Sequence, residues 1–152
     1  MITESSSLNT ADILLLEDEP ADAYSVKMAL KERRIMSNLH HVVDGREGIE
    51  FLNKVGKYSD VPRPDLIFLD LNMPRMNGSE FLIEIKADEK LKDIPVVVLT
   101  TSDVENDVVR CYQLGAASYI TKPVDMTQFI SAIHQLGNYW FTLVRLPQNH
   151  KL

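Results

Sequence analysis

The chain has 152 residues, 45% of them hydrophobic and 25% charged, and its formal net charge at pH 7 is −6. This length suits one domain with a full core, and the acidic balance, with no basic cluster, argues against a nucleic-acid partner. The single cysteine, Cys111, cannot form an internal disulfide. No apolar run approaches the about 20 residues of a membrane span, and the first residues lack the pattern of a signal peptide, so we expect a cytoplasmic protein with no membrane partner.

The first half of the chain alternates predicted strands with predicted helices. Residues 1–10 are polar and serine-rich and predict a mobile arm. Residues 13–16 are wholly apolar and predict a buried strand, after which Pro20 suits the first turn of a helix. Residues 39–43 predict a less apolar strand nearer an edge of the sheet, and the turn at 44–45 leads into a second helix. By their spacing, the inward residues of these two helices are Ala23, Val26, Leu30, Ile49, Leu52 and Val55.

The second half repeats this alternation. Residues 66–69 are apolar with no polar residue between them, which predicts a strand that is buried on both faces. Two further strands are predicted at residues 96–99 and 118–121, and a final helix begins at about Asp125. The inward residues expected for the three helices of this half are Phe81, Leu82, Ile85, Val104, Val108, Cys111, Leu114, Phe129, Ile130, Ile133 and Leu136.

Five strands that alternate with five helical segments require parallel pairing through right-handed crossovers. The three most apolar strands belong in the centre of the sheet. We therefore predict an α/β protein with a doubly wound, five-stranded parallel sheet in the order 2-1-3-4-5, formed by residues 11–136. Residues 137–152 would then follow this domain as an apolar tail.

Residues with distinctive chemistry stand at the ends of the predicted strands. Asp18, Asp70, Thr100 and Lys122 each follow or close a strand, and the carboxyl ends of parallel strands meet at one edge of the sheet. With Glu17, the carboxylates carry three negative charges against the one positive charge of Lys122. Carboxylates packed this closely either bind protons or attract a divalent cation, and a set of oxygen ligands suits Mg²⁺.

Phosphoryl transfer fits these residue types. A carboxylate such as Asp70 can attack phosphorus and form an acyl phosphate, whose charge a divalent cation would offset. Lys122 is a point charge suited to a phosphoryl oxygen, and Thr100 offers a hydroxyl donor. Asn72 can give its backbone carbonyl to the metal. Taken singly, Asp70 could be a strand-end cap and Lys122 a solvated charge, but their predicted convergence favours a site.

The ordered set of motifs resembles the receiver domain of two-component response regulators. The resemblance covers about residues 11–136, and the set is specific although each motif alone is weak. The motifs are Glu17-Asp18, Leu69-Asp70-Leu-Asn-Met-Pro74, Asn77-Gly78, Thr100 and Tyr119-Ile-Thr-Lys122-Pro123.

The resemblance implies the flavodoxin-like receiver fold and a metal-assisted phosphoacceptor site. Asp70 would accept a phosphoryl group from a histidine kinase. Asp18, Asp70 and the backbone carbonyl of Asn72 would bind Mg²⁺, and Glu17 would support the metal through water. Members of the family often have Asp where Glu17 stands, which affects one detail of the metal geometry.

The resemblance also implies a switch. Lys122 would bind a phosphoryl oxygen, Thr100 would move toward the phosphoryl group, and Tyr119 would turn inward behind it. The output would be protein association, so the chain is expected to be a signalling module and not an enzyme acting on other substrates.

A finer resemblance is to single-domain receivers of the phytochrome-associated, cyanobacterial type. It is carried by residues 62–70 and 91–102, by the long loop before Pro62 and by a tail without an output domain. It implies a phytochrome kinase as the partner and a role in light signalling.

Two other functions remain as alternatives. A Mg²⁺-dependent phosphatase also forms an aspartyl-phosphate, but it would need a second Asp near Asp70 as general acid, and Asn72 occupies the obvious place. A flavin carrier of the same fold would need a phosphate-binding loop after the first strand, where the acidic residues 17–19 would instead repel a phosphate.

The tail carries more large apolar residues than a complete domain needs. Left in water they would form the kind of patch that marks an interaction site, and aromatic anchors are typical of such sites. We therefore predict a homodimer in which the final helix and the tail pack against the same elements of a partner. The alternative is that the tail folds back over its own domain. The apolar residues concerned are Leu136, Tyr139, Trp140, Phe141, Leu143, Val144 and Leu146.

Overall fold

The computed structural model describes residues 11–32, 37–101, 105–122, 124–125, 127–128 and 131–132. Within them, five strands form one wholly parallel sheet in the order β2-β1-β3-β4-β5, which confirms the predicted fold class and strand order. The strands are β1 (Ala11–Leu16), β2 (Ser37–Val42), β3 (Leu66–Asp70), β4 (Val96–Thr100) and β5 (Ser118–Thr121). The helices are α2 (Pro20–Glu32), α3 (Gly45–Leu52), α4 (Gly78–Lys86) and α5 (Glu105–Gln113), with a 3₁₀ turn, η1 (Gly56–Tyr58).

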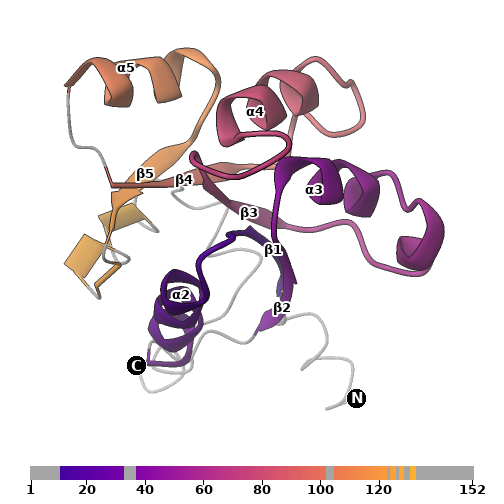
Figure 1. Ribbon diagram of the computed structural model, residues 1–152, viewed down its shortest axis with the longest axis horizontal. Coiled ribbons are helices and arrows are strands. Elements are labelled where there is room, and N and C mark those ends of the chain that lie inside the picture. Colours follow the sequence, from indigo (N-terminus) through magenta and orange to yellow (C-terminus); the bar gives the residue numbers. More distant parts are fainter. Residues whose placement is uncertain are drawn as a thin grey trace, which may run out of the picture.

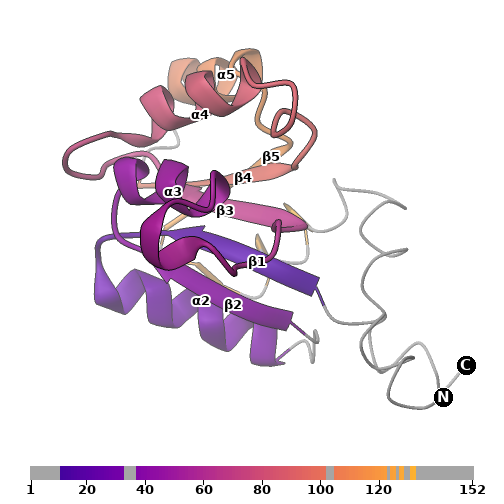
Figure 2. The same ribbon diagram turned by 90° about the vertical axis from the view of Figure 1, so that its right-hand side faces the viewer.

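The helices cover both faces of the sheet. In Figures 1 and 2, α3, α4 and α5 lie on one face and α2 lies on the other. Residues 127–128 and 131–132 are also helical, and Ala132 packs into the same apolar cluster as Val26 and Leu30 of α2. This part of the predicted final helix therefore lies on the α2 face, whereas Phe129, Ile130, Ile133 and Leu136 lie outside the described residues.

The central strands supply both halves of the core. Because successive side chains of a strand point to opposite faces, Leu66 and Phe68 pack beneath α2, while Ile67 and Leu69 pack in the cluster on the other face. All five residues of β3 and all five of β4 are buried. The uninterrupted apolar runs in the sequence are explained by this burial on both faces. By contrast, β2 is a half-exposed edge strand, as predicted.

One predicted helix is shorter than its spacing indicates. Val55 was expected on the inner face of the second helix, but α3 ends at Leu52 and Val55 is 54% exposed. Asn53 is the C-cap, and Lys54 then adopts a left-handed backbone conformation with φ of 57°, which ends the helix before Val55 can join it. Among the described residues, no helix combines the length and the apolar character that crossing a membrane requires.

Candidate functional site

Three carboxylates meet at the carboxyl edge of the sheet. Leu16 of β1 is in register with Leu69 of β3, so the residues that follow them, Glu17 and Asp70, come side by side. Asp18 is next in the chain, and one carboxylate oxygen from each of the three residues lies within 4.8 Å of the others. The edge is the one at which this fold places ligand sites.

The three carboxylates differ in their exposure to solvent. Glu17 is fully buried and Asp70 is 2% exposed, whereas Asp18 is exposed. Burial, together with the neighbouring charge of Asp70, raises the pKa of Glu17 to about 7, although the hydrogen bond from Lys122 lowers it. Burial also raises the pKa of Asp70 above its ordinary value. The site therefore favours a positive charge that would let both buried carboxylates ionise.

Lys122 supplies part of that charge. Its Nζ lies 3.0 Å from Oε1 of Glu17, 3.0 Å from Oδ2 of Asp22 and 3.2 Å from Oδ1 of Asp70. The backbone N–H of Lys122 donates to the carbonyl of Thr100 at 2.7 Å, which fixes the end of β5 beside the end of β4. Burial alone would lower the Lys122 pKa, but the hydrogen bonds to Asp22 and Glu17 raise it above its ordinary value. Lys122 is therefore charged at neutral pH.

The loop after β3 folds tightly against Asp70. The backbone N–H of Asn72 donates to Oδ1 of Asp70 at 3.2 Å, and the N–H of Gly78 donates to the carbonyl of Leu71 at 3.0 Å. A Cβ at Gly78 would lie 2.4 Å from the carbonyl oxygen of Asp70, so only glycine fits there. Asn77 caps α4 through a reciprocal capping box with its third helical residue. The Asn-Gly pair thus starts α4 directly beside the aspartate.

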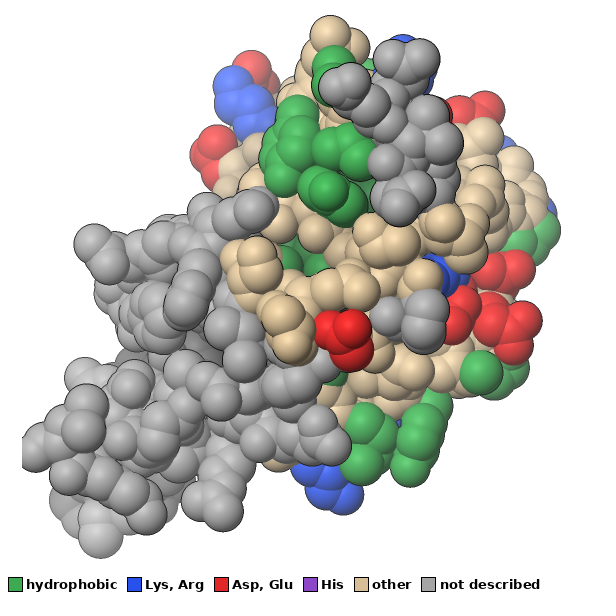
Figure 3. Space-filling view, turned by 90° about the vertical axis from the view of Figure 1, so that its left-hand side faces the viewer, with side chains coloured by type: hydrophobic (Ala, Val, Ile, Leu, Met, Phe, Trp, Pro, Cys, Tyr) green, Lys and Arg blue, Asp and Glu red, His purple; other side chains and the backbone are tan. Residues whose placement is uncertain are grey.

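Thr100 and Tyr119 lie on neighbouring strands. Thr100 closes β4 and is 3% exposed. Tyr119 is half-buried in β5, and its ring meets that of Tyr112 of α5 edge-on, with centroids 6.1 Å apart. Val109 and Tyr112 of α5 are exposed, and Figure 3 shows hydrophobic side chains gathered on the upper part of this face of the molecule.

A second set of contacts holds the loop between β3 and α4 in place. Asp44 is 4% exposed, and its side chain accepts the N–H of Glu47 at 2.8 Å as the N-cap of α3. Arg75 donates to both oxygens of Asp44, from Nε at 2.7 Å and from Nη2 at 3.1 Å. The N–H of Gly45 donates to the carbonyl of Met76 at 3.0 Å. The β2–α3 and β3–α4 loops are therefore joined by side-chain and backbone bonds.

Sequence reasoning did not find Asp22, Asp44 or Arg75. An acidic residue in the first turn of a helix is common, because it interacts favourably with the helix dipole, and Asp22 gave no further signal. Asp44 stood out only as part of an Asp-Gly turn. Its partner Arg75 is 31 residues away, and no local spacing indicates that contact.

The acidic residues fit a divalent cation. Oε1 of Glu17 is buried and makes no hydrogen bond within the described part of the chain, although it lies in ion-pair contact with Lys122. A buried oxygen in this condition gains from a further positive partner or a metal-bound water. Asp18 is exposed, so the cluster opens to solvent. Its donors are all oxygens, which is the set that Mg²⁺ and similar hard ions prefer.

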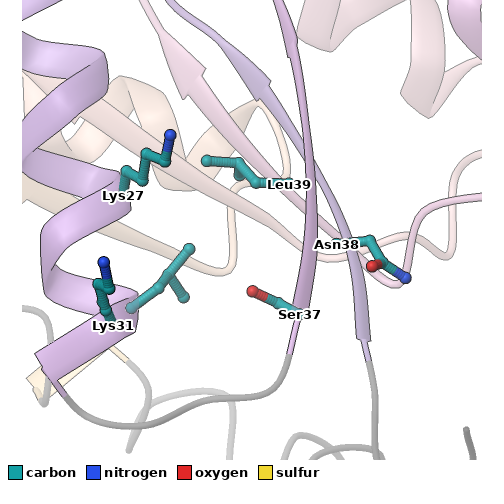
Figure 4. Close-up of a pocket in the computed structure, with 6 residues that line it drawn as sticks. Lys27, Lys31, Ser37, Asn38 and Leu39 are labelled. Atoms are coloured by element: carbon teal, nitrogen blue, oxygen red, sulfur yellow. The ribbon is translucent and has the colours of Figure 1, made fainter.

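Two cavities in the described part of the chain lie away from the acidic cluster. One, of about 460 Å³, is formed between Lys27 and Lys31 of α2 and Leu39 of β2, whose side chain points across toward Lys27 (Figure 4). A neighbouring cavity of about 340 Å³ reaches Pro20 and His41. Neither is lined by a residue of the acidic cluster.

A doubly wound five-stranded sheet with acidic residues and one lysine at its carboxyl edge defines the receiver class of signalling protein. The chain belongs to the response regulator receiver domain family, whose model matches residues 13–134. This match confirms the resemblance seen in the sequence motifs.

Individual relatives confirm the finer resemblance. The chain is similar to response regulator Rcp1 of Synechocystis sp., with 42% identity over 135 residues, which are 89% of this chain and 92% of Rcp1. It is similar to the crystal structure of Mn²⁺-bound Rcp1, with 42% identity and a TM-score of 0.73 over 90% of this chain and 99% of the other. It is also similar to the phosphorylated cyanobacterial phytochrome response regulator RcpA, with 39% identity and a TM-score of 0.74 over 91% and 99% of the two chains.

Proposed function

We propose that this protein is a phosphate-accepting switch, in which Asp70 receives a phosphoryl group from a histidine kinase. The observation that carries the proposal is the position of Asp70. It is buried at the carboxyl end of β3, 3.2 Å from Lys122 and within 4.8 Å of two other carboxylates. The family to which the chain belongs, and the relative described as a phosphorylated phytochrome response regulator, support it.

The chain's own residues account for the transfer step. A carboxylate oxygen of Asp70 attacks the phosphorus of a phosphohistidine, a P–O bond forms, and the P–N bond breaks with its electron pair going to the imidazole nitrogen. Lys122 moves an N–H toward a phosphoryl oxygen and offsets its charge. Asn72 holds Oδ1 of Asp70 through its backbone N–H, which leaves the other oxygen to attack.

Mg²⁺ is the cofactor that we propose for this site, where it would neutralise the phosphoryl oxygens. Asp18, Asp70 and the backbone carbonyl of Asn72 would hold it, and Glu17 would hold one of its waters. The oxygen-only donor set and the unbonded Oε1 of Glu17 support this assignment, as does the Mn²⁺ bound in the structure of Rcp1.

The response to phosphorylation would pass through Thr100 and Tyr119. Thr100 would donate its hydroxyl to the phosphoryl group, and Tyr119 would turn inward from its present contact with Tyr112. The altered surface would then lie on α5 and β5, where Val109 and Tyr112 are already exposed. This surface would change its affinity for a protein partner.

The proposed partner is a phytochrome histidine kinase, because one of the relatives is described as a phytochrome response regulator.

We also propose the domain division seen in the sequence, with a receiver over 11–136, an arm over 1–10 and a tail over 137–152. The tail would support a homodimer. Its residues lie outside the described part of the chain, so this proposal rests on their apolar character alone.

Radiolabel transfer tests the function. Candidate histidine kinases are labelled with phosphate and mixed with the protein in Mg²⁺ or in a chelator, with Asp70→Asn as the matched control. Label should move to the wild type in Mg²⁺, to a limit of one phosphoryl group per chain, and not to the variant. Label in Asp70→Asn would overturn the assignment of Asp70. Repeated turnover of simple phosphate esters would instead support the phosphatase alternative.

A further inference from the structure

The ammonium group of Lys122 has three carboxylate partners. They are Glu17 at 3.0 Å, Asp22 at 3.0 Å and Asp70 at 3.2 Å. An ammonium has three N–H donors, which is the number of these carboxylate partners. Glu17 and Asp70 belong to the acidic cluster at the sheet edge. Asp22 comes from another element, the first turn of α2, and has no role in the function proposed above.

The three carboxylates differ in the free-energy cost of losing their contact with Lys122. The side chains of Glu17 and Asp70 are 0% and 3% exposed, so an unpaired charge on either would remain in the protein interior at a high cost. The side chain of Asp22 is 25% exposed, and water can replace the lysine there. Asp22 is therefore the partner that Lys122 can leave most easily.

We propose that Asp22 is a positioning residue that anchors Lys122 in the unphosphorylated protein and competes with the phosphoryl group for it. An acyl phosphate on Asp70 brings further oxygens that need an N–H donor from Lys122, and Asp22 is the contact given up. This inference rests on the proposed function. It makes α2 sensitive to the state of Asp70, because the release of Lys122 occurs at the first turn of that helix.

A simpler role for Asp22 is to interact with the dipole of α2. Glu19 provides the control for that role, since it directly precedes the helix, its backbone carbonyl accepts the N–H of Ala23, and its side chain is exposed. The contacts described for Glu19 include none with Lys122. Asp22→Asn and Glu19→Gln each remove one negative charge beside the same helix end, but only the first removes a partner of the lysine.

Binding of beryllofluoride, a mimic of the aspartyl phosphoryl group, tests the competition. Calorimetry at saturating Mg²⁺ is carried out on the full chain and on both variants. We expect Asp22→Asn to bind the mimic about two- to fivefold more tightly than wild type, the range expected for a partly exposed ion pair. Glu19→Gln should bind as wild type does. Equal effects in the two variants, or weaker binding in Asp22→Asn, would overturn the inference.

A second measurement tests the contact itself without phosphate. The side-chain ¹H–¹⁵N signal of the Lys122 ammonium is identified by its absence in Lys122→Met. It should shift or broaden in Asp22→Asn and stay in place in Glu19→Gln. If wild type binds beryllofluoride but this signal is the same in Asp22→Asn, the inference about Asp22 fails and the proposed function still stands. If wild type neither binds the mimic nor takes up phosphate, the proposed function fails, and the competition fails with it.

Discussion

At the scale of single residues, solvent exposure separates the roles of the three clustered carboxylates. Glu17 and Asp70 are buried, so replacing either disturbs both the site and the core, whereas Asp18 is exposed and contributes little to packing. A substitution at Asp18 therefore isolates metal binding from folding.

We expect Asp18→Ala to lower the affinity for Mg²⁺ by at least about tenfold, the loss that even supporting residues of metal sites commonly cause, and to abolish phosphorylation. The midpoint of thermal unfolding without metal should stay close to that of wild type. Calorimetric titration with Mg²⁺ measures the affinity, with Glu19→Gln as a charge-matched control. Unchanged affinity in Asp18→Ala would remove this residue from the metal site.

Thr100 allows the response to be separated from phosphorylation. Because its hydroxyl is proposed to contact the phosphoryl group and not to take part in the attack, Thr100→Ala should still be phosphorylated. Amide chemical shifts on α5 and β5 should move with beryllofluoride in wild type and stay in place in the variant. A variant whose shifts move as those of wild type do would exclude Thr100 from the switch.

The sequence predicted those site residues that stand at strand ends, because the order of a parallel sheet brings such ends together. Asp70 and Lys122 are 52 residues apart in the chain and 3.2 Å apart in space for this reason. The contact of Asp22 with Lys122 could not be predicted in the same way. It depends on how α2 sits on the sheet and on which direction a long lysine side chain takes, and neither leaves a periodic pattern.

At the scale of elements, the Asp44–Arg75 pair joins the loops that begin α3 and lead to α4. Arg75 adopts a left-handed backbone conformation with φ of 63°, uncommon for a residue other than glycine, and its side chain reaches back to a buried carboxylate. The loop held in this way contains Asn72, which contacts Asp70. The pair therefore stabilises the segment on which the proposed metal ligand lies.

We expect Arg75→Met to lower the free energy of unfolding at pH 7 by more than Lys92→Met does, because the hydrogen bonds to a buried charge are lost while the N-cap bond of Asp44 remains. Urea denaturation measures the change. Lys92→Met, which removes an exposed ion pair with Glu89, is the control and should change it by less than about 0.5 kcal/mol. Equal stability of Arg75→Met and wild type would show that the Asp44–Arg75 pair does not stabilise the fold.

The Asp44–Arg75 pair also predicts how the stability of the protein depends on pH. Burial raises the pKa of Asp44, but its hydrogen bonds with Arg75 and with backbone N–H groups outweigh this and lower it overall. A carboxylate with a lowered pKa contributes stability above its unfolded pKa of about 4, and that contribution is lost as the pH falls through the lower folded value. The difference between wild type and Arg75→Met should therefore be constant from pH 7 to about 5 and shrink below about 4. If the difference in unfolding free energy persists at low pH, it arises from packing of the Arg75 side chain and not from its charge.

The elements themselves were largely predictable, but their ends were not. Apolar runs located β1, β3 and β4 because burial on both faces leaves no other pattern. Val55 continued the helical spacing of Ile49 and Leu52, yet α3 stops at Leu52 because Lys54 takes a left-handed conformation. Periodicity reports which side chains could face the core and does not report where the backbone leaves the helix.

At the scale of the whole molecule, the question is what covers the apolar tail. The described chain ends at Ala132, which is buried against the cluster beneath α2, and the residues after it lie outside the described part. Residues 133–152 contain Trp140 and Phe141 among several aliphatic residues and no acidic residue. An apolar segment of this kind is stable in water only when another surface covers it.

A two-fold dimer would cover the tail with the same elements of a second copy. We expect the full-length protein to sediment as a dimer at tens of micromolar, and a double variant, Trp140→Ser with Phe141→Ser, to sediment as a monomer. Tyr24→Ser provides the control, since Tyr24 is 62% exposed on α2, outside the proposed interface, and its loss should leave the dimer intact. If the tail instead folds over its own domain, wild type will be monomeric whether phosphorylated or not, and the double variant will be less stable without a change in mass. That result would contradict the dimer, because the same aromatic residues would then be part of the core of a single chain.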